Sequence, residues 1–161
     1  MASPAATKKF LGSLRLSSFD SLLSAKREAC RKCGASRKIF CYDCYEPVGL
    51  PEDALPHVQL PIRVDIVKHP LELQSKSTAV HARILSPSSV RIFMYPEIPE
   101  INDSSKTLLA FPASDALPVS EVDPAKFDSI IFVDSTWFQA KGIVLVRMGK
   151  DCNLSHKCLG I

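Results

Sequence analysis

Two Cys-x-x-Cys pairs constrain the N-terminal part of this chain more than any other feature. Cys30 and Cys33 form the first pair, and Cys41 and Cys44 form the second after seven intervening residues. Two such pairs can direct four thiolates at one tetrahedral ion, which predicts a structural zinc site. Gly34, next to the first pair, permits the sharp turn of a zinc knuckle. An iron–sulfur cluster, a redox pair and four plain cysteines are alternatives, because the seven-residue spacing is shorter than that of common zinc ribbons.

Basic residues gather around these cysteines. Residues 1–50 hold nine Lys and Arg against four Asp and Glu, although the net charge of the 161-residue chain is only +3. This imbalance is typical of an attachment that binds a polyanion, and equally of a solvated basic face without a partner. Lys32, Arg37 and Lys38 lie within the cysteine segment and would surround a bound metal with positive charge.

Composition excludes several classes of protein. Hydrophobic residues make up 46% of the chain and charged residues 23%, which indicates a globular protein. No apolar run approaches the roughly 20 residues that cross a bilayer, and no apolar segment follows the N-terminal lysines, so neither a membrane span nor a secretory signal is expected. The cysteines are therefore expected to be reduced thiols or metal ligands. No GxGxxG or Walker loop is present among the six glycines, so NAD and ATP binding lose their usual support.

Alternating strands and helices are predicted beyond a linker at 51–56. Ile62, Val64 and Ile66 alternate with Arg63, Asp65 and Val67, which predicts a strand that ends at His69-Pro70. Apolar runs predict strands at 90–95, 107–111 and 129–133, the last two continuous, and a helix is expected within 75–85. Strands buried on both faces have continuous apolar sequences, so we expect an α/β domain with a largely parallel sheet and flanking helices. Ligands gather at the carboxyl ends of such strands, where His69 and Asp134 are expected.

Three further segments have local predictions. A short amphipathic helix is expected to begin at Ser17 or Ser18 and to run directly into the first cysteine. The apolar run at 142–146 is consistent with one more strand, which would leave an exposed edge. Cys152 and Cys158, with His156 between them, do not form a convincing ligand set and are expected to be ordinary thiols in a flexible tail.

Four motifs in a fixed order suggest a family. They are His69-Pro70-Leu71-Glu72, Lys76-Ser77-Thr78-Ala79, Leu108-Leu109-Ala110-Phe111-Pro112 and the tetrad Asp134-Ser135-Thr136-Trp137, which follows an apolar strand. Behind a paired-cysteine segment, these motifs resemble the DTW domain family of tRNA-uridine aminocarboxypropyltransferases, in particular its mammalian-type D-loop members. The resemblance covers about residues 28–141. It implies a fold related to the knotted SPOUT-type RNA methyltransferases.

The resemblance also implies an activity and site residues. Family members transfer the 3-amino-3-carboxypropyl group of S-adenosylmethionine to a uridine of tRNA, so tRNA and S-adenosylmethionine are the expected partners. The implied catalytic residues are Asp134, Thr136 and Trp137, and the implied S-adenosylmethionine-binding residues are His69, Glu72 and Ser135. The residues that the resemblance leads us to expect in contact with RNA are Lys32, Arg37, Lys38 and Lys76. Structural alternatives exist for two of these motifs: Trp137 in the core and the Asp-Ser-Thr segment as a helix cap within the tetrad, and His69 as a strand terminator.

The implied domain organisation has four parts. Residues 1–27 are expected to form a basic tail with a short helix, 28–50 the zinc module, 57–148 a partial SPOUT-like catalytic domain, and 149–161 an atypical tail. Family members continue much further beyond the tetrad, so we expect a C-terminally truncated or alternative product that binds S-adenosylmethionine poorly. A non-catalytic zinc- and RNA-binding module is the alternative function. The family implies a location in the nucleus.

Overall fold

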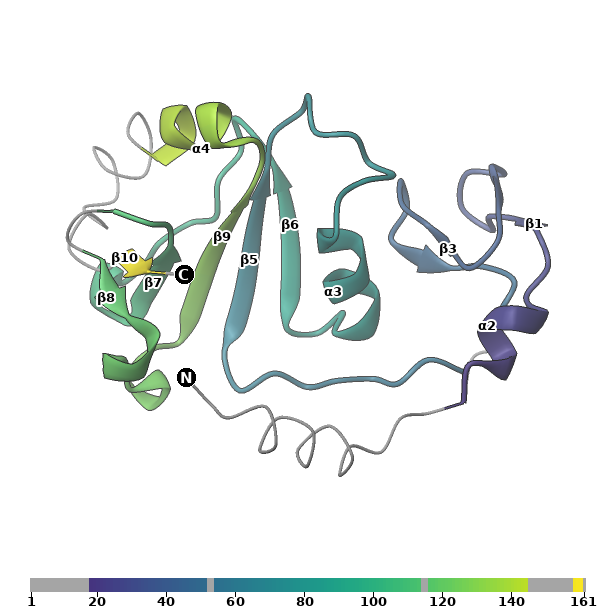
Figure 1. Cartoon of the computed structure of the whole chain (residues 1–161), viewed down its shortest axis with the longest axis horizontal. Coiled ribbons are helices and arrows are strands. Elements are labelled where there is room, and N and C mark those ends of the chain that lie inside the picture. The colour runs from purple at the N-terminus through teal and green to yellow at the C-terminus, as the bar shows by residue number, and fades with distance from the viewer. Residues whose placement is uncertain (1–17, 52–53, 114–115, 145–157, 161) are drawn as a thin grey trace, which may run out of the picture.

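A parallel sheet forms the body of the protein. The computed structural model describes residues 18–51, 54–113, 116–144 and 158–160. Six strands lie in the order β6-β5-β9-β7-β10-β8, and each described neighbouring pair is parallel (Figure 1). The strands are β5 (Arg63–Lys68), β6 (Val90–Met94), β7 (Thr107–Ala110), β8 (Leu117–Pro118), β9 (Ser129–Asp134) and β10 (Cys158–Gly160). The expected α/β class with a largely parallel sheet is therefore confirmed.

The centre of the sheet consists of the strands with the most continuous apolar sequences. All four residues of β7 and the first three of β9 are buried. β5 pairs with β9 over its whole length, from Arg63 opposite Ser129 to Lys68 opposite Asp134. The carboxyl ends of both strands consequently lie at one edge of the sheet, where the backbone N–H of His69 donates to the carbonyl of Asp134 at 3.1 Å.

Two helices cover opposite faces of this sheet. α3 (Ala79–Leu85) packs its Ala79 against a cluster that contains Ile66 of β5. α4 (Trp137–Ile143) packs its Ile143 against a cluster that contains Val67 of β5. Ile66 and Val67 are consecutive strand residues, whose side chains point to opposite faces. The two helices therefore cover β5 from both sides, which buries its last four residues. The alternating sequence of this strand did not predict that double burial, which was expected only for the strands at 107–111 and 129–133.

Short 3-10 helices join the strands at the amino end of the sheet. η2 (Ser104–Lys106) leads into β7, and η3 (Val119–Glu121) and η4 (Pro124–Lys126) lie between β8 and β9. The carboxylate of Asp123 accepts a hydrogen bond from the backbone N–H of Ala125 at 3.1 Å and so caps η4.

The cysteine segment forms two small hairpins beside the body. β1 (Glu28–Ala29) pairs with β2 (Ser36–Arg37), and β3 (Phe40–Cys41) pairs with β4 (Glu46–Pro47), both antiparallel. We call residues 28–50 the cysteine module. Its Phe40 ring meets His81 of α3 edge-on, with ring centroids 4.9 Å apart. This contact places the cysteine module on the same side of the sheet as α3 (Figure 1).

Three local predictions were wrong. The first helix, α2 (Asp20–Ser24), has only five residues and does not reach the first cysteine, because the chain extends at Ala25 and enters β1. No strand forms at residues 142–144, which belong to the end of α4; residues 145–146 lie outside the described chain. Residues 158–160 form β10 between β7 and β8 rather than a loose tail. Cys152 and His156 lie outside the described residues.

Candidate functional site

The first cysteine pair lies in a tight knuckle. Cys30 follows β1 directly, and its carbonyl accepts the backbone N–H of Gly34 at 2.8 Å. The N–H of Cys30 donates to the carbonyl of Ala35 at 2.9 Å, which closes the turn from the other side. Gly34 has a φ of +73°, a backbone conformation that residues with a Cβ rarely adopt. The sharp turn predicted at Gly34 is confirmed.

The second pair repeats this geometry with a different residue. The N–H of Tyr45 donates to the carbonyl of Cys41 at 2.8 Å, as Gly34 does to Cys30. Tyr45 has a φ of 57°, although a tyrosine gives no sequence signal for a left-handed turn. Gly34 predicted the first turn from the sequence. Only the structure shows that the turn at Tyr45 has the same left-handed backbone conformation.

The four cysteine sulfurs form one cluster. All four Sγ atoms lie within 4.8 Å of one another, and those of Cys33 and Cys41 are 3.6 Å apart. A tetrahedral zinc ion with Zn–S bonds of about 2.3 Å separates its sulfurs by about 3.8 Å. The cluster therefore fits a four-thiolate metal site. Such a site has no open position for a substrate, so its role would be structural.

Local hydrogen bonds already favour a thiolate within the cluster. The backbone N–H groups of Cys33 and then Lys32 lower the pKa of Cys30 to about 7. The pKa of Cys44 is raised, chiefly by its hydrogen bond with Cys33 and then by burial. A bound cation would favour the deprotonated form of all four sulfurs.

Gly49 lies near the end of the cysteine module. Its replacement by alanine is expected to destabilise the module by more than about 2 kcal/mol. Its φ is +66°, and an added Cβ would lie 2.6 Å from the carbonyl oxygen of Lys38 and closer still to that of Lys26. Both contacts are with backbone, which cannot swing aside. The loss of unfolding free energy is measured by titrating the metal-loaded chain with urea and using the release of the metal as the signal for unfolding of the module.

Gly34→Ala is the matched control for this variant. Gly34 has a similar φ of +73°, but nothing lies within 4 Å of an added Cβ. Only backbone strain of about 1 kcal/mol is expected there. Equal losses for the two variants would contradict the close approach at Gly49.

The basic residues of the cysteine module are partly neutralised. Lys32 pairs with Glu46, which raises the pKa of Lys32. Arg37 pairs with Asp43 at 2.7 Å and lies over the ring of Tyr42, 4.1 Å from its centroid. Among the side chains expected to bind RNA, Lys38 and Lys76 are exposed and have no ion pair in the described part of the chain. The positive charge available to a polyanion is therefore smaller than the residue count indicates.

Asp134 stands at the carboxyl end of β9 and is held by a residue far away in sequence. The hydroxyl of Ser77 donates to Oδ2 of Asp134 at 2.5 Å. Ser77 itself is buried and precedes α3. A groove of about 310 Å³ runs beside this carboxylate between α3 and β9, and its lining includes Thr78, Phe132 and Asp134. The carboxylate is thus fixed at the wall of an open groove.

The rest of the Asp-Ser-Thr-Trp tetrad begins α4. Thr136 is the N-cap residue, and both its N–H and its hydroxyl donate to Oε1 of Gln139, at 3.2 and 2.9 Å. The alternative that this segment caps a helix therefore holds for Thr136. Trp137 is 66% exposed, with its ring centroid 6.3 Å from that of Phe111, so the alternative of a core tryptophan does not hold. Its indole can accept a stacking partner.

His69 and the residues after it form a turn next to Asp134. The imidazole Nδ1 of His69 accepts the N–H of Leu71 at 3.2 Å, and the ring stacks on Tyr95 with centroids 6.1 Å apart. The N–H of Glu72 donates to the carbonyl of His69 at 2.9 Å. The hydroxyl of Ser135 donates to the carbonyl of Thr136 at 3.3 Å. His69, Ser135 and Asp134 therefore lie at one edge of the sheet, whereas Lys32, Arg37 and Lys38 belong to the cysteine module.

Comparison with known proteins identifies the family. The pattern that defines the DTW domain matches residues 38–151, which is more than half of the chain. The chain belongs to the DTW domain family. The match begins inside the cysteine module and contains the whole edge at which Asp134 lies.

Curated relatives of this DTW chain have names that describe one reaction. The tRNA-uridine aminocarboxypropyltransferase 1 of Mus musculus is 47% identical over 98 residues, which are 60% of this chain and 32% of the mouse protein. The Homo sapiens protein of the same name is 40% identical over an equal share. The tRNA-uridine aminocarboxypropyltransferase 2 of Drosophila melanogaster is 30% identical over 67% of this chain and 49% of its own length.

The chain spans about a third of the length of the vertebrate relatives it matches. No solved structure matches it. In the described part of the chain, no helix has both the length and the apolar sequence that a membrane crossing requires.

Lys68 and Gln74 are two polar residues of the DTW body that the sequence did not single out. Lys68, the register partner of Asp134, is 1% exposed, and its Nζ donates to Oε1 of Gln74 at 2.8 Å. Gln74 and Ser77 both belong to the loop between β5 and α3. They connect this loop to β5 and β9 respectively, so the loop is fastened to the sheet at two points. A lysine after an apolar run resembles an exposed strand end, and no sequence signal indicated its burial.

Proposed function

We propose that this chain carries out, as part of the DTW family, the transfer of the 3-amino-3-carboxypropyl group from S-adenosylmethionine to a uridine in the D-loop of tRNA. The observation that carries the proposal is Asp134, a carboxylate fixed by Ser77 at 2.5 Å beside a groove and followed by the exposed ring of Trp137. The names of the matched relatives support the same reaction. The product is 3-(3-amino-3-carboxypropyl)uridine.

The reaction needs a base and an aligned electrophile. S-adenosylmethionine is a sulfonium compound, and whichever of its carbons is held in line with the nucleophile reacts. N3 of the uracil forms the new bond to carbon, the carbon–sulfur bond breaks, and methylthioadenosine departs with the electron pair. The proton of N3 passes to the carboxylate of Asp134. Because Ser77 occupies Oδ2, Oδ1 is the oxygen that accepts this proton.

The neighbouring residues have positioning roles in this proposal. Trp137 stacks on the uracil or the adenine, for which its 66% exposure leaves room. Thr136 orients the start of α4 through its bonds to Gln139. His69, Glu72 and Ser135 contact the amino acid portion of S-adenosylmethionine, with Glu72 offering a carboxylate to its ammonium group.

The cysteine module has a structural and an RNA-binding role in the proposal. Cys30, Cys33, Cys41 and Cys44 hold one zinc ion, in keeping with their mutual distances. Lys38 and Lys76 contact tRNA phosphates directly. Lys32 and Arg37 contact phosphates when they exchange their ion pairs with Glu46 and Asp43 for the RNA. The proposal also divides the chain into the cysteine module at 28–50 and a SPOUT-like catalytic domain at 57–148, and the parallel sheet and the family membership support a catalytic domain of this kind. A nuclear location is proposed from the family resemblance alone.

Nucleoside mass spectrometry tests the proposal. Unmodified tRNA transcript is incubated with the zinc-loaded chain and S-adenosylmethionine, then digested to nucleosides. We expect 3-(3-amino-3-carboxypropyl)uridine to appear with S-adenosylmethionine and to be absent without it. The mouse relative serves as the positive control. No product from this chain, beside product from the relative under the same conditions, would contradict the transfer and favour a non-catalytic binding module.

A further inference from the structure

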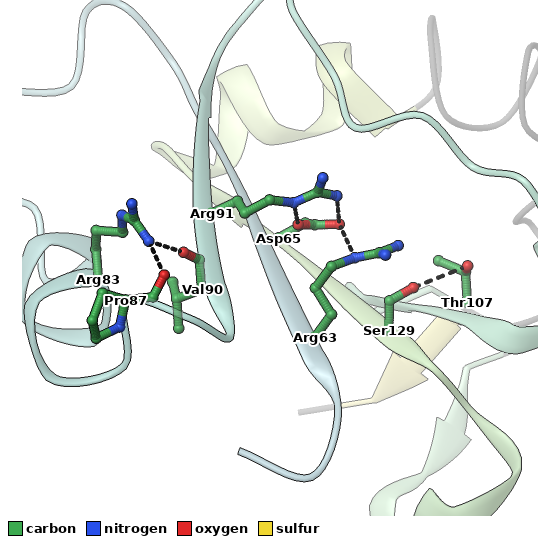
Figure 2. Close-up of polar contacts among 8 residues, drawn as sticks. All are labelled: Arg63, Asp65, Arg83, Pro87, Val90, Arg91, Thr107 and Ser129. Carbon is green, nitrogen blue, oxygen red and sulfur yellow. Dashed lines mark hydrogen bonds and ion pairs between the residues drawn. The ribbon is translucent and has the colours of Figure 1, made fainter. Parts of the chain in front are cut away.

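A buried carboxylate interrupts the apolar sequence of β5. Asp65 is 1% exposed and accepts Nε and Nη2 of Arg91 at 2.7 and 2.9 Å, while Nε of Arg63 reaches its Oδ2 at 3.2 Å (Figure 2). A carboxylate buried this deeply requires a positive partner. The bidentate bonds from Arg91 already meet that requirement.

The second arginine gives this cluster an excess positive charge. Arg63 binds Asp65 only through Nε, and its two terminal nitrogens have no hydrogen-bond partner within the described chain (Figure 2). The side chains of Arg63 and Arg91 are 43% and 47% exposed. Two cations share one anion, and both guanidinium groups remain accessible from solvent. By contrast, Lys32 and Arg37 each have a carboxylate of their own.

The cluster lies on the sheet face opposite α3. Arg63 and Asp65 alternate with Val64 and Ile66, and so share the face of Val67, on which α4 packs. Nearby on this face, the hydroxyls of Thr107 and Ser129 bond to each other at 3.1 Å (Figure 2). α4 follows the carboxyl end of β9, whereas these polar residues occupy the amino halves of their strands. β6, which carries Arg91, is an edge strand of the sheet.

We propose that Arg63 and Arg91 bind phosphodiester groups of an RNA backbone, with Asp65 holding the two guanidinium groups in place. This inference rests on the proposed function, which supplies the RNA. A guanidinium group matches phosphate oxygens with paired donors, and its charge stays constant. Because Asp65 already holds both arginine side chains, each of them loses less conformational entropy when it binds a phosphate.

The location of the cluster fits contact with the same RNA that reaches Asp134. Asp65 lies three residues before Lys68, the register partner of Asp134, a distance of about 10 Å along the strand. β6, which carries Arg91, is the last strand at that edge of the described sheet. An RNA that passes around this edge can meet both faces.

The salt dependence of tRNA binding tests the proposal. Fluorescence anisotropy with tRNA transcript is recorded from about 50 to 300 mM salt. Arg63→Gln leaves Arg91 and Asp65 paired, and we expect about three- to tenfold weaker binding and a slope of log K against log salt reduced by about 1. The triple variant Arg63→Met, Asp65→Leu, Arg91→Met leaves no unpaired buried charge and is expected to reduce the slope by about 2.

Lys126→Gln is the matched control. Lys126 is also a surface cation, with a 76% exposed side chain and a carboxylate 4.0 Å away. Its replacement is expected to leave the slope unchanged. Unchanged slopes for the Arg63→Gln and triple variants, with melting temperatures equal to that of the parent, would overturn the proposal.

Arginine modification separates this proposal from the transfer reaction. Phenylglyoxal labelling of the unaltered chain, read by mass spectrometry, should show Arg63 and Arg91 protected by tRNA but not by the same concentration of inorganic phosphate. Product formation on tRNA while both arginines stay reactive would overturn the phosphate site and leave the transfer intact. Protected arginines without product would support the site and contradict the transfer. Protection that depends on protein concentration without RNA would indicate a second copy of the chain, and would overturn the proposal.

Discussion

Cys41→Ser is expected to lower the bound zinc from about one equivalent to nearly none and to unfold the cysteine module. Cys41 is fully buried at the end of β3, and its sulfur lies within 4.8 Å of the other three. Four-thiolate zinc sites contribute about 10–16 kcal/mol to the folding of small domains, far more than a few short strands can supply. Metal analysis of the purified chain measures the loss, and hydrogen exchange of residues 28–50 measures the unfolding.

Two comparisons make this result specific. Chelation of the unaltered chain should reproduce the increased exchange in residues 28–50, while the β5–β9 core stays protected, since its contacts lie within the body. Cys152→Ser replaces a cysteine that belongs to neither Cys-x-x-Cys pair and should retain the metal. A Cys41→Ser chain that keeps a full equivalent of zinc, or a module that stays protected after chelation, would contradict a structural metal site.

Asp134→Asn is expected to slow product formation about 100- to 10,000-fold. The amide keeps the size of the carboxylate but cannot take the proton of N3. Ser77→Ala removes the 2.5 Å hydrogen bond to Oδ2 but keeps the base, so a loss of about tenfold is expected. The rates of the two variants are measured by nucleoside mass spectrometry under single-turnover conditions. Because the tRNA is saturated with enzyme, these rates do not depend on RNA affinity.

Asp128→Asn serves as the control carboxylate for these variants. Asp128 has a 70% exposed side chain, paired with Lys106 at 3.5 Å, and precedes the start of β9 rather than following its end. Its rate should equal that of the parent chain. A rate for Asp134→Asn that matches Asp128→Asn, at equal tRNA affinity and melting temperature, would show that Asp134 is not the base.

Local sequence determined the features that depend on neighbouring residues. Continuous apolar runs predicted β7 and β9, because strands buried on both faces require such runs, and the alternation of apolar residues predicted β5. The cysteine spacing predicted the four-sulfur cluster, and Gly34 predicted one sharp turn. The position of Asp134 at a strand end followed from the end of its apolar run. Each of these features is encoded within about fifteen residues of sequence.

Only the tertiary structure decided which polar side chains meet. Ser77 and Asp134 are 57 residues apart and touch because β9 pairs with β5, from which the Ser77 loop departs. Asp65 and Arg91 meet because β6 takes the other side of β5. Sequence periodicity assigns a residue to a face of a strand but not to a neighbouring strand, since strand order depends on the burial that the whole sheet achieves. For this reason the four-cysteine cluster could be predicted from sequence, whereas the partner of Asp134 and the paired arginines could not.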